Sequence, residues 1–172
     1  MKGMAVRKMM MLAMLAVIAL TIFMVEAQIP LPLPIPDIKL GLANIVTVYA
    51  VFVWGPGEAL LILLTRILLG ALFAGQVMSL MYSLAGGALA LLVMVGLRRI
   101  LSQKQIWLAG VLGAMAHNIG QIAVAVLITQ TPGLVVYLPF LLIAGALAGC
   151  FTGVCAQAAM GHLDKLSALR RP

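Results

Sequence analysis

The chain has 172 residues, of which 65% are hydrophobic and 9% are charged, and its formal net charge is +7. A soluble domain contains about 25% charged residues, so this composition excludes an ordinary soluble protein. Most apolar residues stand in runs long enough to cross a hydrocarbon core of about 30 Å, which predicts an all-α integral membrane protein embedded in the lipid bilayer. The basic residues lie between these runs, so the positive charge indicates membrane topology and not nucleic-acid binding.

Six apolar stretches follow one another along the chain and predict a single domain, a bundle of six transmembrane helices. Their expected bounds are 9–29, 38–54, 58–76, 79–97, 106–129 and 134–161. The sequences Gly55-Pro56-Gly57 and Thr131-Pro132-Gly133 are turn signals between neighbouring stretches. The connections are short, so no soluble domain is expected beside the bundle.

The first stretch permits two interpretations. A basic start, a long apolar run and the small residues around Glu26 are also the features of a signal peptide. The run is longer than the roughly 7–15 residues of a signal-peptide core, which favours a retained helix. Cleavage near Ala27 is the alternative, and it would leave the other loops on the same sides of the membrane.

A proline-rich linker joins the first and second stretches. Pro30, Pro32, Pro34 and Pro36 occupy every second position, and Asp37 follows them. Proline lacks an N–H group and restricts the preceding residue to extended backbone, so this linker should be stiff and extended. It is suited to lie across the mouth of a cavity, and a rigid connector at the membrane surface is the alternative.

Basic residues are distributed unevenly between the two ends of the predicted bundle. One end carries nine lysines and arginines, whereas the other carries only Lys39 beside two acids. By the positive-inside rule, both termini of this multi-pass protein should be cytoplasmic in the cell inner (cytoplasmic) membrane. The nine residues are Lys2, Arg7, Lys8, Arg98, Arg99, Lys104, Lys165, Arg170 and Arg171.

Arg66 is the most costly residue to place in lipid. It lies eight residues into its stretch, about 12 Å deep at 1.5 Å per residue. An arginine at the centre of a span costs roughly 2.5–3.5 kcal/mol on insertion scales, so it should face the bundle interior and have a partner. That partner is either an anionic ligand group, such as phosphate or carboxylate, or polar groups of the bundle itself. Extension of the side chain toward the cytoplasm is a third interpretation.

A polar stripe marks the fifth stretch. His117 and Gln121 are four residues apart and share a helix face, and Asn118 lies one position round. The stripe predicts the lining of a ligand cavity, with hydrogen bonding between helices as the alternative. The candidate ligand contacts, none of them catalytic, are Lys39, Asn44, Arg66, His117, Asn118 and Gln121.

Two further patterns concern partners and chemistry. Gly145, Gly149 and Gly153 repeat every four residues, a small-residue ridge for internal packing or for docking a separate membrane subunit. The sequence shows no nucleotide-binding loop, no paired-aspartate motif and no metal-ligand spacing. We therefore expect neither an enzyme nor a metal or cofactor site.

Five motifs occur in order over about residues 31–153, namely Ile35–Ile45, Arg66–Gly70, Ser83–Gly87, Ala116–Gln121 and Tyr137–Pro139. With these motifs the chain resembles the Gx transporter family, also known as heptaprenyl diphosphate synthase component I. That family is similar to the substrate-binding (S) components of energy-coupling-factor transporters. The resemblance implies an S-component-like six-helix fold, an outward ligand pocket, and a transmembrane coupling subunit and ATPases as partners. The first stretch departs from this pattern because it lacks a clean Ala-x-x-x-Ala docking surface.

The sequence thus predicts a membrane substrate-binding or transport component for a small anionic or amphipathic molecule. The alternative is a non-catalytic membrane subunit linked to prenyl diphosphate, quinone or flavin redox metabolism. In that case the polar stripe binds an isoprenoid head group or only holds helices together.

Overall fold

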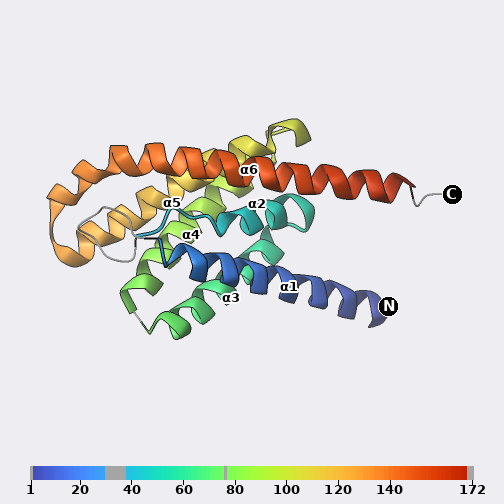
Figure 1. Ribbon diagram of the computed structural model, residues 1–172, viewed down its shortest axis with the longest axis horizontal. Coiled ribbons are helices and arrows are strands. Elements are labelled where there is room, and N and C mark those ends of the chain that lie inside the picture. Colours follow the sequence, from blue (N-terminus) through green and yellow to red (C-terminus); the bar gives the residue numbers. More distant parts are fainter. Residues whose placement is uncertain (1, 30–37, 76, 170–172) are drawn as a thin grey trace.

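The computed structural model describes the backbone of residues 2–29, 38–75 and 77–169. The proline linker at 30–37, with Asp37, and Gln76, Arg170 and Arg171 lie outside the described residues. The described part is a helical bundle (Figure 1). Its helices are α1 (Lys2–Glu26), α2 (Asn44–Val53), α3 (Pro56–Ala74), α4 (Val77–Arg98), α5 (Ile106–Thr129) and α6 (Leu138–Leu169), with two 3-10 segments, η1 (Gln103–Gln105) and η2 (Pro132–Tyr137).

Five helical segments in the described ranges are long and apolar enough to cross a membrane, which confirms the all-α membrane class. The structure differs from the prediction over 38–54, where a helix of spanning length was expected. The observed helix α2 covers only Asn44–Val53. Its ten residues span about 15 Å, roughly half of a hydrocarbon core. The described residues thus contain five helices of spanning length and one shorter apolar helix, and the count of six spans stays a prediction.

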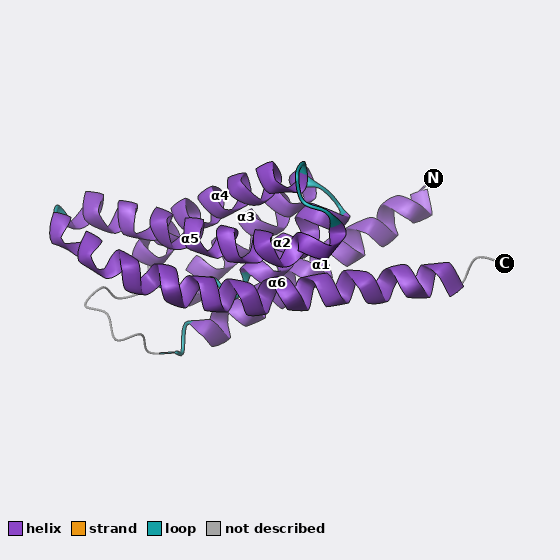
Figure 2. Cartoon of the chain, turned by 90° about the horizontal axis from the view of Figure 1, so that it is seen from above, coloured by secondary structure: helices purple, strands orange, loops and turns teal. Residues whose placement is uncertain are grey.

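The short helix α2 is the centre of the bundle. It contacts each of the other five α-helices, and six of its ten residues are buried. Around it, α1 packs on α3, α3 on α4, α4 on α5 and α5 on α6 (Figures 1 and 2). The first turns of α1 and the last turns of α6 project from the same end of the molecule (Figure 1). A short apolar helix of this kind is typical of a buried core element.

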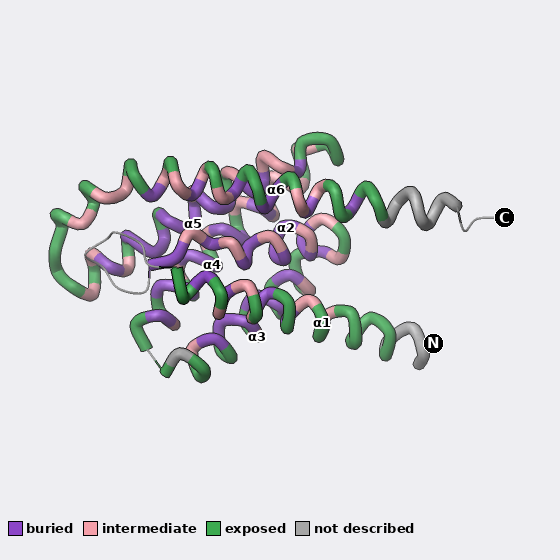
Figure 3. The backbone as a smooth tube through the Cα atoms, in the orientation of Figure 1, coloured by how far each residue is buried: buried purple, intermediate pink, exposed green. Residues whose placement is uncertain are grey.

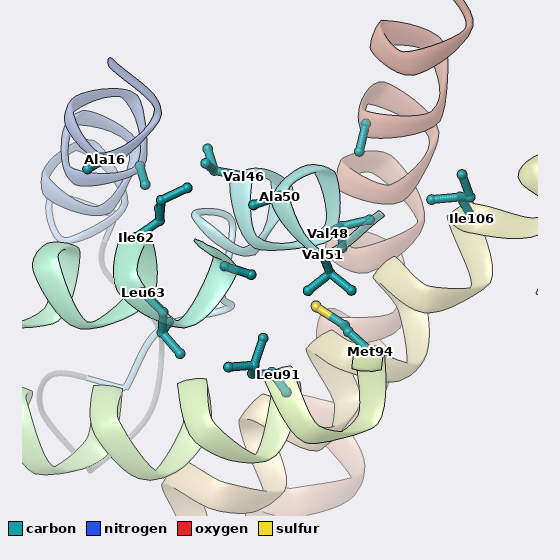
Figure 4. Close-up of a cluster of buried hydrophobic side chains, with 14 of the residues drawn as sticks. Ala16, Val46, Val48, Ala50, Val51, Ile62, Leu63, Leu91, Met94 and Ile106 are labelled. Carbon is teal, nitrogen blue, oxygen red and sulfur yellow. The ribbon is translucent and has the colours of Figure 1, made fainter. Parts of the chain in front are cut away.

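The apolar core lies where α2 meets α3 and α4. Val48 and Val51 of α2 share one cluster with Leu63 of α3 and with Leu91 and Met94 of α4, and Val51 points toward Met94 (Figure 4). All five side chains are buried. The outer faces of α1 and α6 are exposed along most of their length (Figure 3), as expected for helices that contact lipid.

The glycine ridge of α6 is used inside the bundle. A Cβ atom on Gly149 would lie 2.5 Å from the carbonyl oxygen of Gly110 on α5, and one on Gly153 would lie 2.5 Å from that of Trp107. Only glycine permits two helix backbones to approach this closely. The ridge is therefore covered by α5 and is not a free surface for a separate subunit.

Candidate functional site

All six predicted contacts are buried, with exposures of 0–6%. They come from the segment before α2 (Lys39), from α2 (Asn44), from α3 (Arg66) and from α5 (His117, Asn118 and Gln121). The helix order of the bundle thus gathers polar side chains that lie up to 82 residues apart in the chain. Burial of so many polar groups requires partners, so the arrangement of their hydrogen bonds defines the site.

A chain of hydrogen bonds runs from Lys39 into α5. The backbone N–H of Lys39 donates to Gln121 Oε1 at 3.1 Å, and this contact fixes the orientation of the Gln121 amide. Gln121 Nε2 then lies 2.7 Å from His117 Nε2 and must donate to it. His117 is therefore a neutral imidazole with its proton on Nδ1, the atom that faces the backbone of Gly86 on α4.

Residues 38–41 are not helical although a helix was predicted there, and hydrogen bonds from their N–H groups explain why. Gly41 has φ of +85°, a conformation that glycine adopts without strain. Its N–H donates to Glu26 Oε1 at 2.6 Å, as that of Lys39 does to Gln121. Non-helical backbone is tolerated within a membrane only where protein groups satisfy its hydrogen bonds, as Gln121 and Glu26 do for these two N–H groups.

Lys39 lies inside the bundle and does not extend outward. Its Nζ donates to Ser79 Oγ at 3.2 Å and lies 3.4 Å from the centroid of the Phe23 ring. Arg66 faces the same ring, with Cζ 5.4 Å from the centroid. The structure thus brings Lys39 and Arg66 to one aromatic side chain.

Arg66 is 2% exposed, so its side chain is buried inside the bundle and does not extend to the surface. Its Nε and Nη2 atoms have no hydrogen-bond partner among the described residues. The polar groups of the bundle therefore leave this cation unsatisfied, although Arg66 lies close enough to His117 to act on it electrostatically. An unpartnered buried guanidinium is the feature expected of an anion-binding residue.

Glu26 is the site residue that sequence reasoning missed. It ends α1 and is 4% exposed, with Oε1 bound to Gly41 and Oε2 without a partner. The positive charges of Arg66 and Lys39 both act on this carboxylate. Its signal in the sequence is a lone acid at the end of a long apolar run, inside the predicted first span 9–29.

The two asparagines have different surroundings. Asn118 Nδ2 donates to the carbonyl of Leu141 on α6 at 2.6 Å and fills space left by Gly145, so it belongs to the α5–α6 interface. Asn44 lies beside Gly41 and close to His117. Both amide atoms of Asn44 lack a partner. Asn44 therefore remains with the site, whereas Asn118 is separated from it.

Most of the chain matches one known protein family. A family model described as heptaprenyl diphosphate synthase component I matches residues 15–159. The chain belongs to this family. The match includes every residue of the polar site, from Glu26 on α1 to Gln121 on α5. The similarity to S components of energy-coupling-factor transporters remains a prediction.

Comparison with curated proteins and with solved structures gave no significant match to this component I family member. Within the described residues, no three His, Cys, Asp or Glu side chains gather as metal ligands would. A cavity of about 610 Å³ lies apart from the polar site, between α2, η1 and α6. Phe52, Lys104, Val154 and Gln157 are among its lining residues.

Proposed function

We propose that this protein is a membrane substrate-binding component that holds a small anionic or amphipathic molecule at Arg66, as one step of its transport. The observation that carries the proposal is the buried guanidinium with two unpartnered nitrogens. A buried charge without a partner is strongly unfavourable, and a ligand phosphate or carboxylate supplies that partner through charge-assisted hydrogen bonds. Lys39, Asn44, His117 and Gln121 complete the site, and Asn118 supports it from the α5–α6 interface.

The distribution of charge supports an orientation for this site. Lys8 pairs with Glu58 near the start of α3, and Arg98 lies beside the same turn at Gly55. With Arg99 and Lys104, these basic residues favour a cytoplasmic location for this end, and with it for both termini. The polar site then lies toward the outer side of the cytoplasmic membrane. Because Phe23 and Glu26 of α1 are part of it, we propose that α1 is retained.

Partners follow from the same proposal. Transport against a gradient needs energy, and the chain carries no nucleotide-binding loop. We propose that a transmembrane coupling subunit and ATPases supply it. The docking surface would have to lie outside the α6 glycine ridge, which α5 covers.

The family description favours a second candidate function. "Component I" of a heptaprenyl diphosphate synthase suggests a non-catalytic membrane subunit that works beside a prenyl diphosphate enzyme. The ligand would then be a prenyl diphosphate with its diphosphate at Arg66. Both candidates place an anion at the same guanidinium, so the identity of the bound molecule distinguishes them.

The test is native mass spectrometry of the full chain purified from its own membranes. We expect a co-purifying small molecule whose occupancy is lost in Arg66→Ala and kept in the matched control Arg99→Ala, because Arg99 is exposed. A hydrophilic anion supports transport, and a prenyl diphosphate supports the second candidate. An empty wild-type protein, or a ligand indifferent to Arg66, contradicts the anion site.

A further inference from the structure

Glu26 and Arg66 are both buried, yet they do not pair. Among the described residues, neither Glu26 nor Arg66 forms an ion pair. Glu26 Oε2 and the Nε and Nη2 atoms of Arg66 are left without hydrogen bonds. In a membrane interior, a carboxylate and a guanidinium that attract each other gain much by contact. Their separation in the bundle therefore needs a cause.

Packing and backbone contacts keep the two groups apart. The hydrogen bond from Gly41 N–H to Oε1 holds the carboxylate of Glu26 at the end of α1. One turn earlier on α1, Phe23 packs onto Gly70 of α3, where a Cβ atom would lie 2.6 Å from the ring. This packing of Phe23 against Gly70 places the aromatic ring next to Arg66, whose Cζ lies 5.4 Å from the ring centroid. The carboxylate and the guanidinium are thus fixed by separate contacts, each with free hydrogen-bonding capacity.

Asn44 adds a third unsatisfied group beside Glu26. Its Nδ2 atom is 2.7 Å from where a Cβ of Gly41 would be, and Gly41 is the residue that binds Glu26. The Asn44 side chain is 1% exposed, and both its donor and its acceptor lack partners. The site therefore presents unsatisfied acceptors at Glu26 and Asn44, as well as unsatisfied donors at Arg66 and Asn44.

We propose that Glu26 and Arg66 are the two ends of one ligand clamp, so that the ligand carries a negatively charged group for Arg66 and an ammonium group for Glu26. This inference rests on the proposed anion site and adds the second half of the ligand. A prenyl diphosphate does not fit the clamp, because its head presents only oxygen atoms and the Glu26 carboxylate would repel them. The substrate class is a small zwitterion with a phosphate or carboxylate at one end.

The test uses two matched pairs of probes that differ only in the ammonium group. Phosphoethanolamine is compared with ethyl phosphate, and β-alanine with propionate, by calorimetric titration of the purified full chain. We expect the wild type to bind the ammonium-bearing member of at least one pair about tenfold or more tightly, the size of a charged hydrogen bond. Glu26→Gln should remove this preference, and Arg66→Met should weaken both members of the pair.

Two features keep the test interpretable. Gln at position 26 retains an acceptor for the Gly41 N–H, and an unchanged unfolding temperature would show that the fold is kept. Glu58→Gln is the control, because Glu58 pairs with Lys8 at 2.5 Å at the other end of the bundle and should leave the preference intact.

The possible failures are distinguishable. Equal binding of both members of each pair, lost in Arg66→Met, overturns the clamp and leaves the anion site standing. A preference that survives Glu26→Gln also overturns the clamp. Probe binding that is indifferent to Arg66→Met overturns the anion site itself. No binding of any of the four probes overturns the clamp, and the native mass spectrometry of Arg66→Ala then decides the anion site.

Discussion

The backbone N–H of Lys39 binds the side chain of Gln121, 82 residues later in the chain, at 3.1 Å. This bond attaches the segment before α2 to the polar face of α5. The same Gln121 amide also determines the tautomer of His117. One buried side chain therefore controls both the path of the chain into α2 and the hydrogen-bond pattern of the site.

Gln121→Leu should destabilise the protein, because it leaves the N–H of Lys39 and the Nε2 of His117 unsatisfied in a buried position. Each such group costs about 1–3 kcal/mol, so we expect a clearly lower midpoint of thermal unfolding in detergent. Gln103→Leu is the control, since Gln103 is exposed in η1. Equal midpoints for the two variants would show that the Lys39–Gln121 bond contributes nothing to stability.

Gly86→Ala should destabilise the bundle through the His117 ring. The added Cβ would lie 2.9 Å from His117 Nδ1 and 2.8 Å from its carbonyl oxygen, and overpacking of this kind costs about 1–3 kcal/mol. Gly96→Ala on the same helix meets nothing within 4 Å and should stabilise α4 by up to about 1 kcal/mol. Urea or thermal unfolding should show changes of opposite sign in the stability of the two variants. A stabilised Gly86→Ala would refute the close contact between Gly86 and His117.

The sequence was sufficient to predict the helices and the candidate residues on them. Arg66 and the stripe at His117 and Gln121 are recognisable because a polar group within an apolar run is costly in lipid. Each of these signals is local, because it can be recognised within the sequence of a single helix. The all-α membrane class follows from the same reasoning about hydropathy.

The departures from prediction both depend on contacts between distant segments. Residues 38–41 are apolar enough to predict a helix, and the acceptors on Glu26 and Gln121 make non-helical backbone acceptable there. The role of Glu26 was missed because its partner Gly41 lies beyond the proline linker. Neither contact has a periodic signature in the sequence, so pattern analysis could not find them.

Gly149→Ala should separate α5 from α6. The added Cβ would meet the Gly110 carbonyl oxygen at 2.5 Å and Val111 Cα at 2.8 Å. Both are backbone atoms, which cannot move away as a side chain can, so we expect a cost at or above about 3 kcal/mol. Gly161→Ala, also on α6, meets nothing within 4 Å and should be tolerated. Folded yield and unfolding midpoint measure the difference, and indistinguishable variants would mean that the helices do not approach this closely.

Lys104 and Gly133 offer a direct test of the proposed orientation, because they lie in connections at opposite ends of α5. Both positions are exposed, so a cysteine at either should react without disturbing the fold. The two native cysteines, Cys150 and Cys155, are first replaced by alanine to remove background labelling.

In this background, a membrane-impermeant maleimide should label Gly133→Cys in intact cells and Lys104→Cys only after permeabilisation. The physical reason is that Arg98, Arg99 and Lys104 lie together in the α4–α5 connection, and such basic loops are retained in the cytoplasm during insertion. The opposite labelling pattern would place the basic end outside. The polar site at Glu26 and Arg66 would then open toward the cytoplasm, and the ligand would be one that the cell makes and not one that it takes up.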